Sequence, residues 1–422
     1  MTDWIGIKRF ACLIVLSLSA GSTIADSVVL KARGWLDVDS GRINEPALLV
    51  IEDDRIKSID PEGDVTGMAV IDAGDLILLP GFMDMHTHLA STPEGDWAHR
   101  RVTDSTAYYA MRSAFHARNT LMAGFTTVRE VGAPDFVDVA LSRATDKGWI
   151  DGPRIIPSGN FVGTTGGHCD ETAYKPGVLE FGYREGIADG PAELVKAVRY
   201  QIKHGAKAIK ICATAGVMSF EASPGAQQMT DEEMRAVVEE ARRHDAKVAA
   251  HAHGTQGIIA ASNAGVDSVE HGSILNRQAV DVLKKNGTYL VPTIFMWFLE
   301  YDLPPEIDAK NEYVKGFIDD SMRLAISSGV KIAFGTDAGE FEHGRNAEEF
   351  AALVERGMSP IDAIRTATVN AADLLDLDDR GRIAAGLLAD IVGVPGNPLE
   401  DIRVTENVQF VMKGGKVYRM PE

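Results

Sequence analysis

The middle of the chain alternates strand-like runs with helix-like segments, and this alternation limits the possible fold more than any other feature. Apolar, β-branched runs recur eight times and are separated by stretches with helical periodicity. One of these stretches begins with Thr230 and Glu233 at the spacing of a capping box. Eight strand–helix units over about 250 residues predict an α/β fold, a (β/α)8 TIM barrel. The expected strands are 80–87, 125–132, 154–161, 206–214, 247–254, 268–273, 288–295 and 331–339.

Both ends of the chain show a different pattern. Residues 26–80 and 383–422 contain short alternating runs broken by Gly and Asp, and Gly414-Gly415 marks the turn of a hairpin. We expect the two ends to form one small β-sandwich domain beside a barrel that spans 81–382.

The first 25 residues resemble an export signal. Lys8 and Arg9 precede an apolar stretch of about 11 residues, which is too short to cross a bilayer, and small residues follow near Ala25. The alternative is an ordinary N-terminus of a cytosolic protein. We expect a signal peptide over 1–25, a periplasmic or secreted protein, and no membrane span once the signal is removed.

Charge and cysteine content exclude several classes of protein. The formal net charge is −19, which argues against nucleic acid or an anionic membrane surface as a partner. Beyond residue 25 the chain keeps only Cys169 and Cys212. Two cysteines do not make a disulfide scaffold, and their spacing is not that of a cysteine zinc site.

Histidines gather where the predicted strands end. The carboxyl ends of barrel strands carry the chemistry of such folds, so these side chains should meet at one rim. Imidazole is the commonest ligand for zinc and related metals, which makes a metal site the favoured interpretation. A lone His-x-His pair would be weak evidence. Seven of the eleven histidines follow this pattern: His86, His88, His168, His251, His253, His271 and His343.

Lys210 and Asp337 complete the set of polar residues at this rim. Lys210 shares one face of its strand with Ala208 and Cys212, so it should point into the barrel. A bare ammonium group beside metal cations would be desolvated and repelled, whereas uptake of CO2 would turn it into a bridging carbamate. The alternatives are a lysine that reaches the barrel mouth and a Schiff-base lysine. Asp337 is expected to bind one ion, the alternative being a turn or helix-cap aspartate.

These motifs together resemble the amidohydrolase superfamily. "GFMDMHTHL", "IKICAT", "VAAHAHG", "VEHGS" and "FGTDAG" match its strand-end motifs in order, and the "LADIVGVPGNPLEDI" tail is also typical. The resemblance implies two divalent ions, most simply zinc. His86, His88 and Asp337 would bind one ion, His251 and His271 the other, and carboxylated Lys210 both.

Within that superfamily the chain resembles the prolidase-like dipeptidases and carboxypeptidases, a branch that includes ochratoxin-hydrolysing amidases. The loops "TTGGHCDETAYKP" and "IKICATAGVMSFEASPGAQQMTDEEM" are most similar to members that cleave Xaa-Arg and Xaa-Lys. The resemblance implies hydrolysis of the amide before a C-terminal residue in dipeptides or N-acyl amino acids. A metal-bridging hydroxide would attack while Asp337 carries the proton. His168, His253 and Arg345 are candidates for substrate contact.

Three other interpretations stay open on the sequence alone. An Xaa-Pro dipeptidase or an ochratoxin-type amidase would use the same ligands. A mononuclear deaminase or imidazolonepropionase-like enzyme would not need Lys210, and a non-catalytic scaffold should have lost ligands. Relatives form octamers, so we expect a homo-oligomer.

Overall fold

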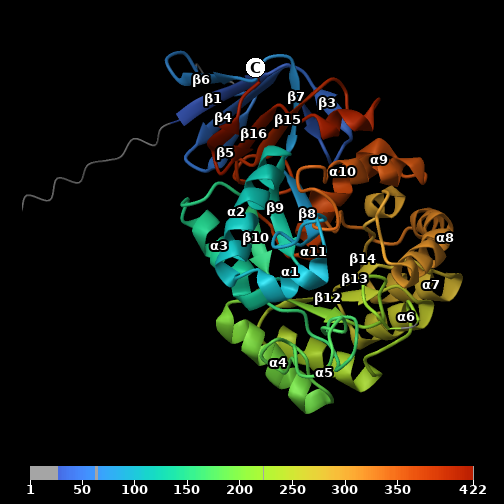
Figure 1. The fold of residues 1–422 in the computed structure, drawn as a ribbon. Coiled ribbons are helices and arrows are strands. Elements are labelled where there is room, and N and C mark those ends of the chain that lie inside the picture. Colours follow the sequence, from blue (N-terminus) through green and yellow to red (C-terminus); the bar gives the residue numbers. More distant parts are fainter. Residues whose placement is uncertain (1–26, 62–64, 222, 422) are drawn as a thin grey trace, which may run out of the picture.

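The structure is a computed structural model that describes residues 27–61, 65–221 and 223–421. The predicted signal peptide lies outside the described residues and stays a prediction. Figure 1 shows strands from both ends of the chain at one end of the molecule, with the helices grouped around parallel strands below them. The strands are β1 (Ser27–Ala32), β2 (Gly34–Asp37), β3 (Arg42–Asn44), β4 (Ala47–Glu52), β5 (Arg55–Ile59), β6 (Ala69–Asp72), β7 (Leu76–Pro80), β8 (Phe82–Thr87), β9 (Phe125–Glu130), β10 (Arg154–Pro157), β11 (Ala208–Cys212), β12 (Lys247–Ala252), β13 (Ser268–His271), β14 (Tyr289–Val291), β15 (Ile391–Pro395), β16 (Phe410–Lys413) and β17 (Lys416–Arg419).

The helices follow the strands in alternation through the middle of the chain. The predicted capping box is confirmed, because the Thr230 side chain accepts from the Glu233 backbone and the Glu233 side chain accepts from the Thr230 backbone. The helices are α1 (Trp97–Thr103), α2 (Thr106–Met122), α3 (Val137–Asp146), α4 (Pro191–His204), α5 (Asp231–Arg242), α6 (Thr255–Ala264), α7 (Arg277–Asn286), α8 (Pro305–Ser328), α9 (Glu348–Glu355), α10 (Pro360–Thr366) and α11 (Val369–Leu374), with short 3-10 turns at Pro134–Phe136, Phe295–Phe298 and Ile402–Glu406.

Two parallel sheets carry the strands of the middle region. Their orders are β8-β9-β10 and β11-β12-β13-β14, and single parallel bridges connect Val162 to Ile211, Thr87 to Ala338 and Leu290 to Ile332. The chain is therefore a mixed α/β fold. Seven of the expected strands form, mostly shorter than predicted.

The expected eighth strand, 331–339, forms only isolated bridges within the described residues. Its backbone leaves the extended conformation at Asp337, whose φ is 62°. The Asp84 side chain also accepts from the Thr336 backbone and hydroxyl, at 3.2 and 2.6 Å. Backbone hydrogen bonds still connect β8 to this segment, from Met85 to Phe334 and from Asp337 to His86, and the Asp84 side chain adds its contacts at Thr336.

Strands from the two ends of the chain share sheets. The orders are β5-β4-β1-β6 and β17-β16-β15-β7-β2-β3, and β7 pairs with β15 across about 310 residues of chain. The predicted hairpin at Gly414-Gly415 joins β16 to β17. A buried apolar cluster draws on both ends of the chain and contains Leu30, Leu49, Leu78, Ile391 and Phe410.

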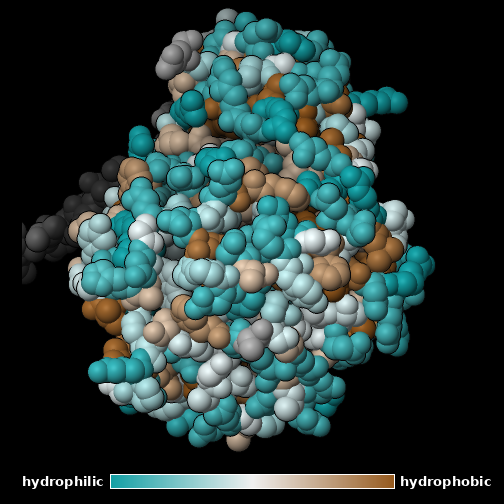
Figure 2. All heavy atoms as spheres, turned by 45° about the vertical axis from the view of Figure 1, so that its right-hand side comes forward, coloured by the Kyte–Doolittle hydropathy of each residue, from teal (hydrophilic) through white to brown (hydrophobic). Residues whose placement is uncertain are grey.

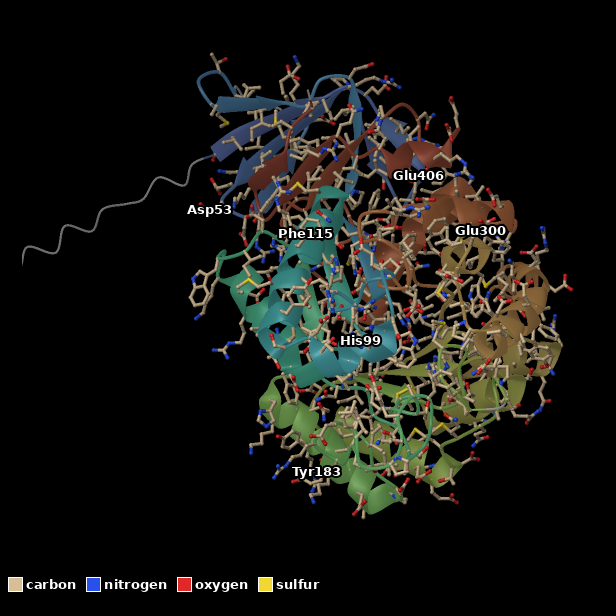
Figure 3. The ribbon with its side chains drawn as sticks, viewed as in Figure 1. Asp53, His99, Phe115, Tyr183, Glu300 and Glu406 are labelled. Atoms are coloured by element: carbon tan, nitrogen blue, oxygen red, sulfur yellow. A yellow bond between two sulfur atoms is a disulfide. The ribbon has the colours of Figure 1, made fainter. Side chains whose placement is uncertain are left out.

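Hydrophilic residues predominate on the face in Figure 2, and hydrophobic ones form small separate groups. Among the described residues, no helix is both long and apolar enough to cross a membrane. An exposed apolar stripe does occur on α2, where Tyr108, Met111 and Phe115 (labelled in Figure 3) are 57%, 74% and 63% exposed.

Candidate metal centre

Strand ends bring six predicted metal ligands into one buried cluster. The candidate ligand atoms of His86, His271 and Asp337 all lie within 4.8 Å of one another, as do those of His251, His253 and His271. His271 belongs to both groups and so joins them. The Nε2 atom of His88 lies 3.3 Å from the Asp337 carboxylate.

Lys210 reaches this cluster from β11. Its Nζ atom lies 3.4 Å from His86 Nε2, and the side chain is almost fully buried, as expected for a lysine that points inward. Burial lowers the pKa of Lys210 to about 8, although the nearby Glu270 and Asp337 favour its charged form. A substantial fraction of Lys210 is therefore a neutral amine near pH 8, which is the form that can react with CO2.

Two candidate ligands, His271 at the end of β13 and Asp337 in the segment 331–339, adopt an unusual backbone conformation. His271 and Asp337 have φ values of 68° and 62°, in the left-handed region that residues other than glycine rarely adopt. Such conformations persist where surrounding contacts hold them, often at functional sites. Here they aim two side chains inward just as the parallel strands end.

Hydrogen bonds behind the ring nitrogens orient the histidines. His271 Nδ1 bonds Thr293 Oγ1 and His253 Nδ1 bonds Ser273 Oγ, each at 2.8 Å. His88 Nδ1 lies 3.2 Å from the Gly132 carbonyl oxygen. These contacts occupy Nδ1 and leave Nε2 free, which is the usual arrangement behind metal-binding imidazoles.

Glu270 faces the site, although strand alternation places it on the side of β13 opposite to His271. Its carboxylate lies 2.8 Å from His86 Nδ1 and accepts from Arg129 Nη2, also at 2.8 Å. The left-handed backbone at His271 turns that side chain toward the same space that Glu270 faces. Glu270 therefore orients His86, and the Arg129 guanidinium compensates the buried charge.

Asp84 supports the other side of the centre. Its carboxylate accepts from Thr336 Oγ1 at 2.6 Å and from Asn346 Nδ2 at 2.8 Å, and burial raises its pKa to about 6. It fixes the backbone immediately before Asp337. The sequence signals for Asp84 and Arg129 were charged residues inside otherwise apolar strands.

Burial keeps the clustered imidazoles neutral. Desolvation lowers the pKa of His88 to about 4 and that of His253 to about 3, and it holds those of His251 and His271 well below their usual range. Neutral imidazole is the form that binds a metal.

One further observation indicates that these side chains are suited to metal binding. His251 Nε2 is buried and has no hydrogen-bond partner among the described residues. An unpartnered buried nitrogen is costly unless another group binds it. The cluster combines that nitrogen with further imidazoles and one carboxylate, a set suited to zinc.

His168 sits above the cluster on the loop that follows β10. Its ring lies 4.2 Å from the His251 ring, and its Nδ1 is 2.6 Å from Ser219 Oγ. An added Cβ on Gly216 would lie only 2.2 Å from the His168 ring, so the absence of a side chain at Gly216 makes room for it. The next residue, Cys169, forms a disulfide with Cys212, a pairing the sequence gave no reason to expect.

The other predicted residues lie in different surroundings. Arg345 is ion-paired with Glu348 at 2.6 Å and with Glu342 at 3.2 Å, and its role in substrate contact stays a prediction. The His343 ring stacks on His116, 4.3 Å away, outside both ligand groups. His99 lies on α1, labelled in Figure 3.

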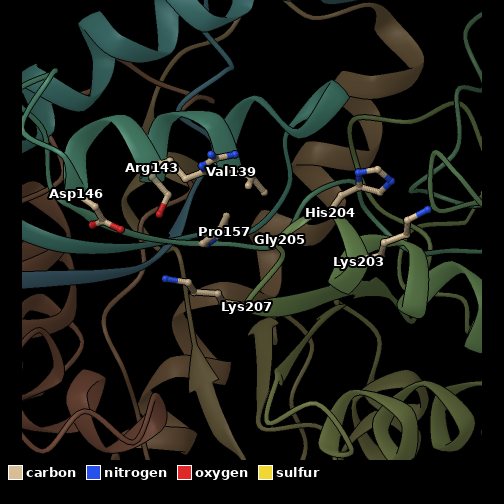
Figure 4. A pocket seen from close by; sticks show the side chains of 9 residues that line it. Val139, Arg143, Asp146, Pro157, Lys203, His204, Gly205 and Lys207 are labelled. Carbon is tan, nitrogen blue, oxygen red and sulfur yellow. The ribbon is translucent and has the colours of Figure 1, made fainter. Parts of the chain in front are cut away.

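A surface hollow of about 300 Å³ lies away from this centre (Figure 4). It is lined by Val139, Arg143 and Asp146 of α3 and by residues at the turn after α4, including His204. None of the clustered histidines lines it, so it plays no part in the site.

Known proteins provide an independent comparison. The family model for the amidohydrolase family matches residues 77–418. Ochratoxinase of Aspergillus niger is 33% identical over 96% of this chain and 89% of its own. A crystal structure of an Xaa-Pro dipeptidase with bound methionine in the active site has a TM-score of 0.89 and 38% identity, over 93% of this chain and all of that one.

A crystal structure of a prolidase complexed with N-methylphosphonate-L-proline has a TM-score of 0.85 and 32% identity, over 93% of this chain and all of that one. The matched region contains every strand-end residue described above. The chain is thus a member of the amidohydrolase family, in its prolidase-like branch.

Proposed function

We propose that the protein is a binuclear metal-dependent hydrolase of the amide bond before a C-terminal residue, in dipeptides or short N-acyl amino acids. One observation carries the proposal: two groups of buried candidate ligands share His271, and Lys210 Nζ lies 3.4 Å from His86 Nε2. A mononuclear deaminase would not require that lysine.

The architecture that we propose with this function is a closed barrel with an attached sandwich. The bridges at Val162, Thr87 and Leu290 link the two parallel sheets in the order that closure of eight strands requires. The two terminal sheets would form the sandwich around their shared apolar cluster. The boundaries at residues 80 and 383 belong to this proposal.

Two zinc ions would be held by His86, His88, His251, His271 and Asp337, with carboxylated Lys210 as the shared ligand. Such ions would polarise the amide carbonyl and lower the pKa of water. The chain's own contribution begins with the neutral amine of Lys210, whose nitrogen would bond to the carbon of CO2 and lose a proton. The resulting carbamate anion would replace the ammonium group of Lys210, which two metal cations would repel.

Asp337 would hold and return the proton. Its carboxylate lies 3.3–3.4 Å from the Nε2 atoms of His86 and His88, at the open end of the strands. An acceptor at that place can take a proton from the attacking water and deliver it to the leaving amine. His168 would donate a hydrogen bond to the substrate oxygen that becomes negative.

A basic C-terminal residue is the substrate side chain we propose. Burial and, to a lesser extent, the charge of Asp337 raise the pKa of Glu340 to about 8, while the charge of Arg100 opposes this shift. Its carboxylate has no hydrogen bond or ion pair with the described residues. A guanidinium or ammonium group would supply one, and the net charge of −19 also attracts cations.

Xaa-Pro dipeptides and ochratoxin-type amides are the second candidate. The similarity to an Xaa-Pro dipeptidase and to ochratoxinase favours these substrates.

The deciding experiment compares kcat/KM of the zinc-loaded enzyme for Ala-Arg, Ala-Pro, Ala-Phe and Ala-Arg amide. Ala-Arg should be the best substrate, and Glu340→Gln should lower its kcat/KM without lowering that of Ala-Phe. A preference for Ala-Pro or Ala-Phe would refute the basic specificity. Equal rates on free and amidated Ala-Arg would refute recognition of the C-terminal carboxylate.

Export and self-association complete the proposal. A disulfide between Cys169 and Cys212 supports an exported protein, because such bonds are rare in reducing compartments. The exposed stripe of Tyr108, Met111 and Phe115 on α2 supports a homo-oligomer, for which an octamer is the size to test.

A further inference from the structure

The disulfide joins two elements of the candidate site. Cys169 directly follows His168, and Cys212 ends β11 two residues after Lys210. The two Cα atoms are 5.8 Å apart, across 43 residues of sequence. The bond therefore links the loop that presents His168 to the strand that presents Lys210.

Besides the disulfide, that loop is attached by polar contacts: Thr165 bonds Asp189, Glu171 pairs with Arg101, and Thr172 accepts from the Phe220 backbone. Among residues 164–175 only Gly167 is buried, so the loop lacks an apolar anchor of its own. The His168 backbone donates to Gln228 Oε1 at 2.9 Å, and its ring bonds Ser219. Partly exposed polar contacts contribute little each, so a loop held by them opens locally at a lower cost than a buried strand. The covalent bond is then its strongest attachment.

The packing at the bond leaves the histidine little freedom. An added Cβ on Gly163 would lie 2.7 Å from Cys169 Cβ, so the cysteine fits closely against that backbone. Gly216 lies against the His168 ring on the other side. With the bond intact, the His168 ring is confined between Gly216, Ser219 and His251.

We propose that the Cys169–Cys212 disulfide is a redox-dependent clamp that holds His168 over the metal centre, so that the hydrolase reaches full activity only where the bond can form. The inference rests on the proposed function. Formation removes two electrons and two protons from the thiols, which a disulfide oxidoreductase of an oxidising compartment would accept. A chain retained in a reducing compartment would keep two thiols and a loosely held His168.

A phosphine reductant tests the clamp without adding a thiol that binds zinc. It breaks the sulfur–sulfur bond and leaves two thiols, while phosphorus is oxidised and water supplies the oxygen and the protons. Cys169 is partly exposed, whereas Cys212 is only 4% exposed, so attack at Cys169 is expected. Intact mass after alkylation reports the redox state. All samples carry Cys12→Ser, so that the bridge is the only sulfur pair.

Two readouts are taken on the oxidised and reduced protein. Hydrogen exchange should increase in peptides covering 163–175, with the β12 and β13 peptides unchanged. For the best dipeptide, kcat/KM should fall about 10- to 100-fold, mostly through kcat, because a misplacement of about 1 Å has that effect. Metal content should stay constant. The Cys169→Ser, Cys212→Ser double variant should have the hydrogen exchange and kcat/KM of the reduced enzyme. The phosphine should not change either value.

Three results would overturn the inference. Unchanged exchange in 163–175 after complete reduction would show that the loop does not depend on the bond. Faster exchange with unchanged kcat/KM would mean that the bond stabilises the loop but does not affect hydrolysis. Loss of zinc in parallel with activity would place the effect at the metal instead. If neither form hydrolyses any dipeptide, the proposed function fails, and hydrogen exchange alone decides whether the clamp exists. If the double variant does not fold, reduction of the folded wild-type protein still tests the inference.

Discussion

Replacing Gly216 with alanine should displace His168 and little else. The new Cβ would lie 2.2, 2.4 and 2.5 Å from the Cε1, Nδ1 and Nε2 atoms of the His168 ring. Ordinary contact begins near 3.4 Å, so the ring must retreat by about 1.2 Å. The adjacent disulfide limits movement of the loop backbone, and the ring therefore loses its place beside Ser219 and His251.

We expect Gly216→Ala to lower kcat/KM for the best dipeptide about 100-fold, since a misplacement of about 1 Å has that effect. This corresponds to about 2.7 kcal/mol of transition-state stabilisation. His168 lies in neither ligand group, so metal content should not change. Steady-state kinetics and elemental analysis of the same preparation provide both numbers.

Two controls make the result specific. Gly316→Ala places a Cβ in open space on α8 and should leave kcat/KM unchanged. In a His168→Ala background, Gly216→Ala should have almost no further effect, because the group it displaces is gone. Activity within twofold of wild type, or full additivity of the two changes, would refute the assignment of His168.

Three further predictions concern other parts of the molecule. Lys210→Ala should lower metal content from about two ions per chain and abolish hydrolysis, with partial rescue by small carboxylates; full activity with one ion would contradict the binuclear centre. The hydrogen bond from Arg199, with those from Arg243 and His244, lowers the pKa of Glu240 to about 2, so its contribution to stability is present above pH 4.5 and lost as the pH falls toward 2. Because both arginines are exposed, Glu240→Gln should cost about 1 kcal/mol in urea unfolding at pH 7 and progressively less toward pH 2. Mass spectrometry of the native protein should show a first residue near Asp26, whereas an intact Met1 on cytosolic protein would contradict export.

The clustering of the candidate ligands could be predicted from the sequence because strand geometry fixes where they lie. Parallel strands end at one rim, so residues such as His86 and His251 had to meet there once the alternation was recognised. The paired sheets at the two ends were also predictable from their short alternating runs. Element bounds were less accurate, as β10 and β14 are several residues shorter than expected.

The supporting contacts could not be predicted for a definite reason. Alternation in an ideal strand places Glu270 and His271 on opposite sides, but the left-handed φ of His271 turns its side chain toward the space that Glu270 faces. The partnership of Cys169 with Cys212 depends on a loop path that periodicity does not describe. Residues 331–339 have a strand-like composition and make backbone hydrogen bonds to β8, yet the left-handed φ of Asp337 interrupts the extended conformation.

The pairing of β7 with β15 has a consequence for how the molecule is made. As the chain leaves the ribosome, β7 can pair with β2 on one edge. Its other edge stays unpaired until β15, about 310 residues later, has been synthesised. Loop closure over such a distance is slow, and an open strand edge is a site of aggregation. The sheet that contains β7 and β15 can therefore be completed only after nearly the whole chain has been synthesised.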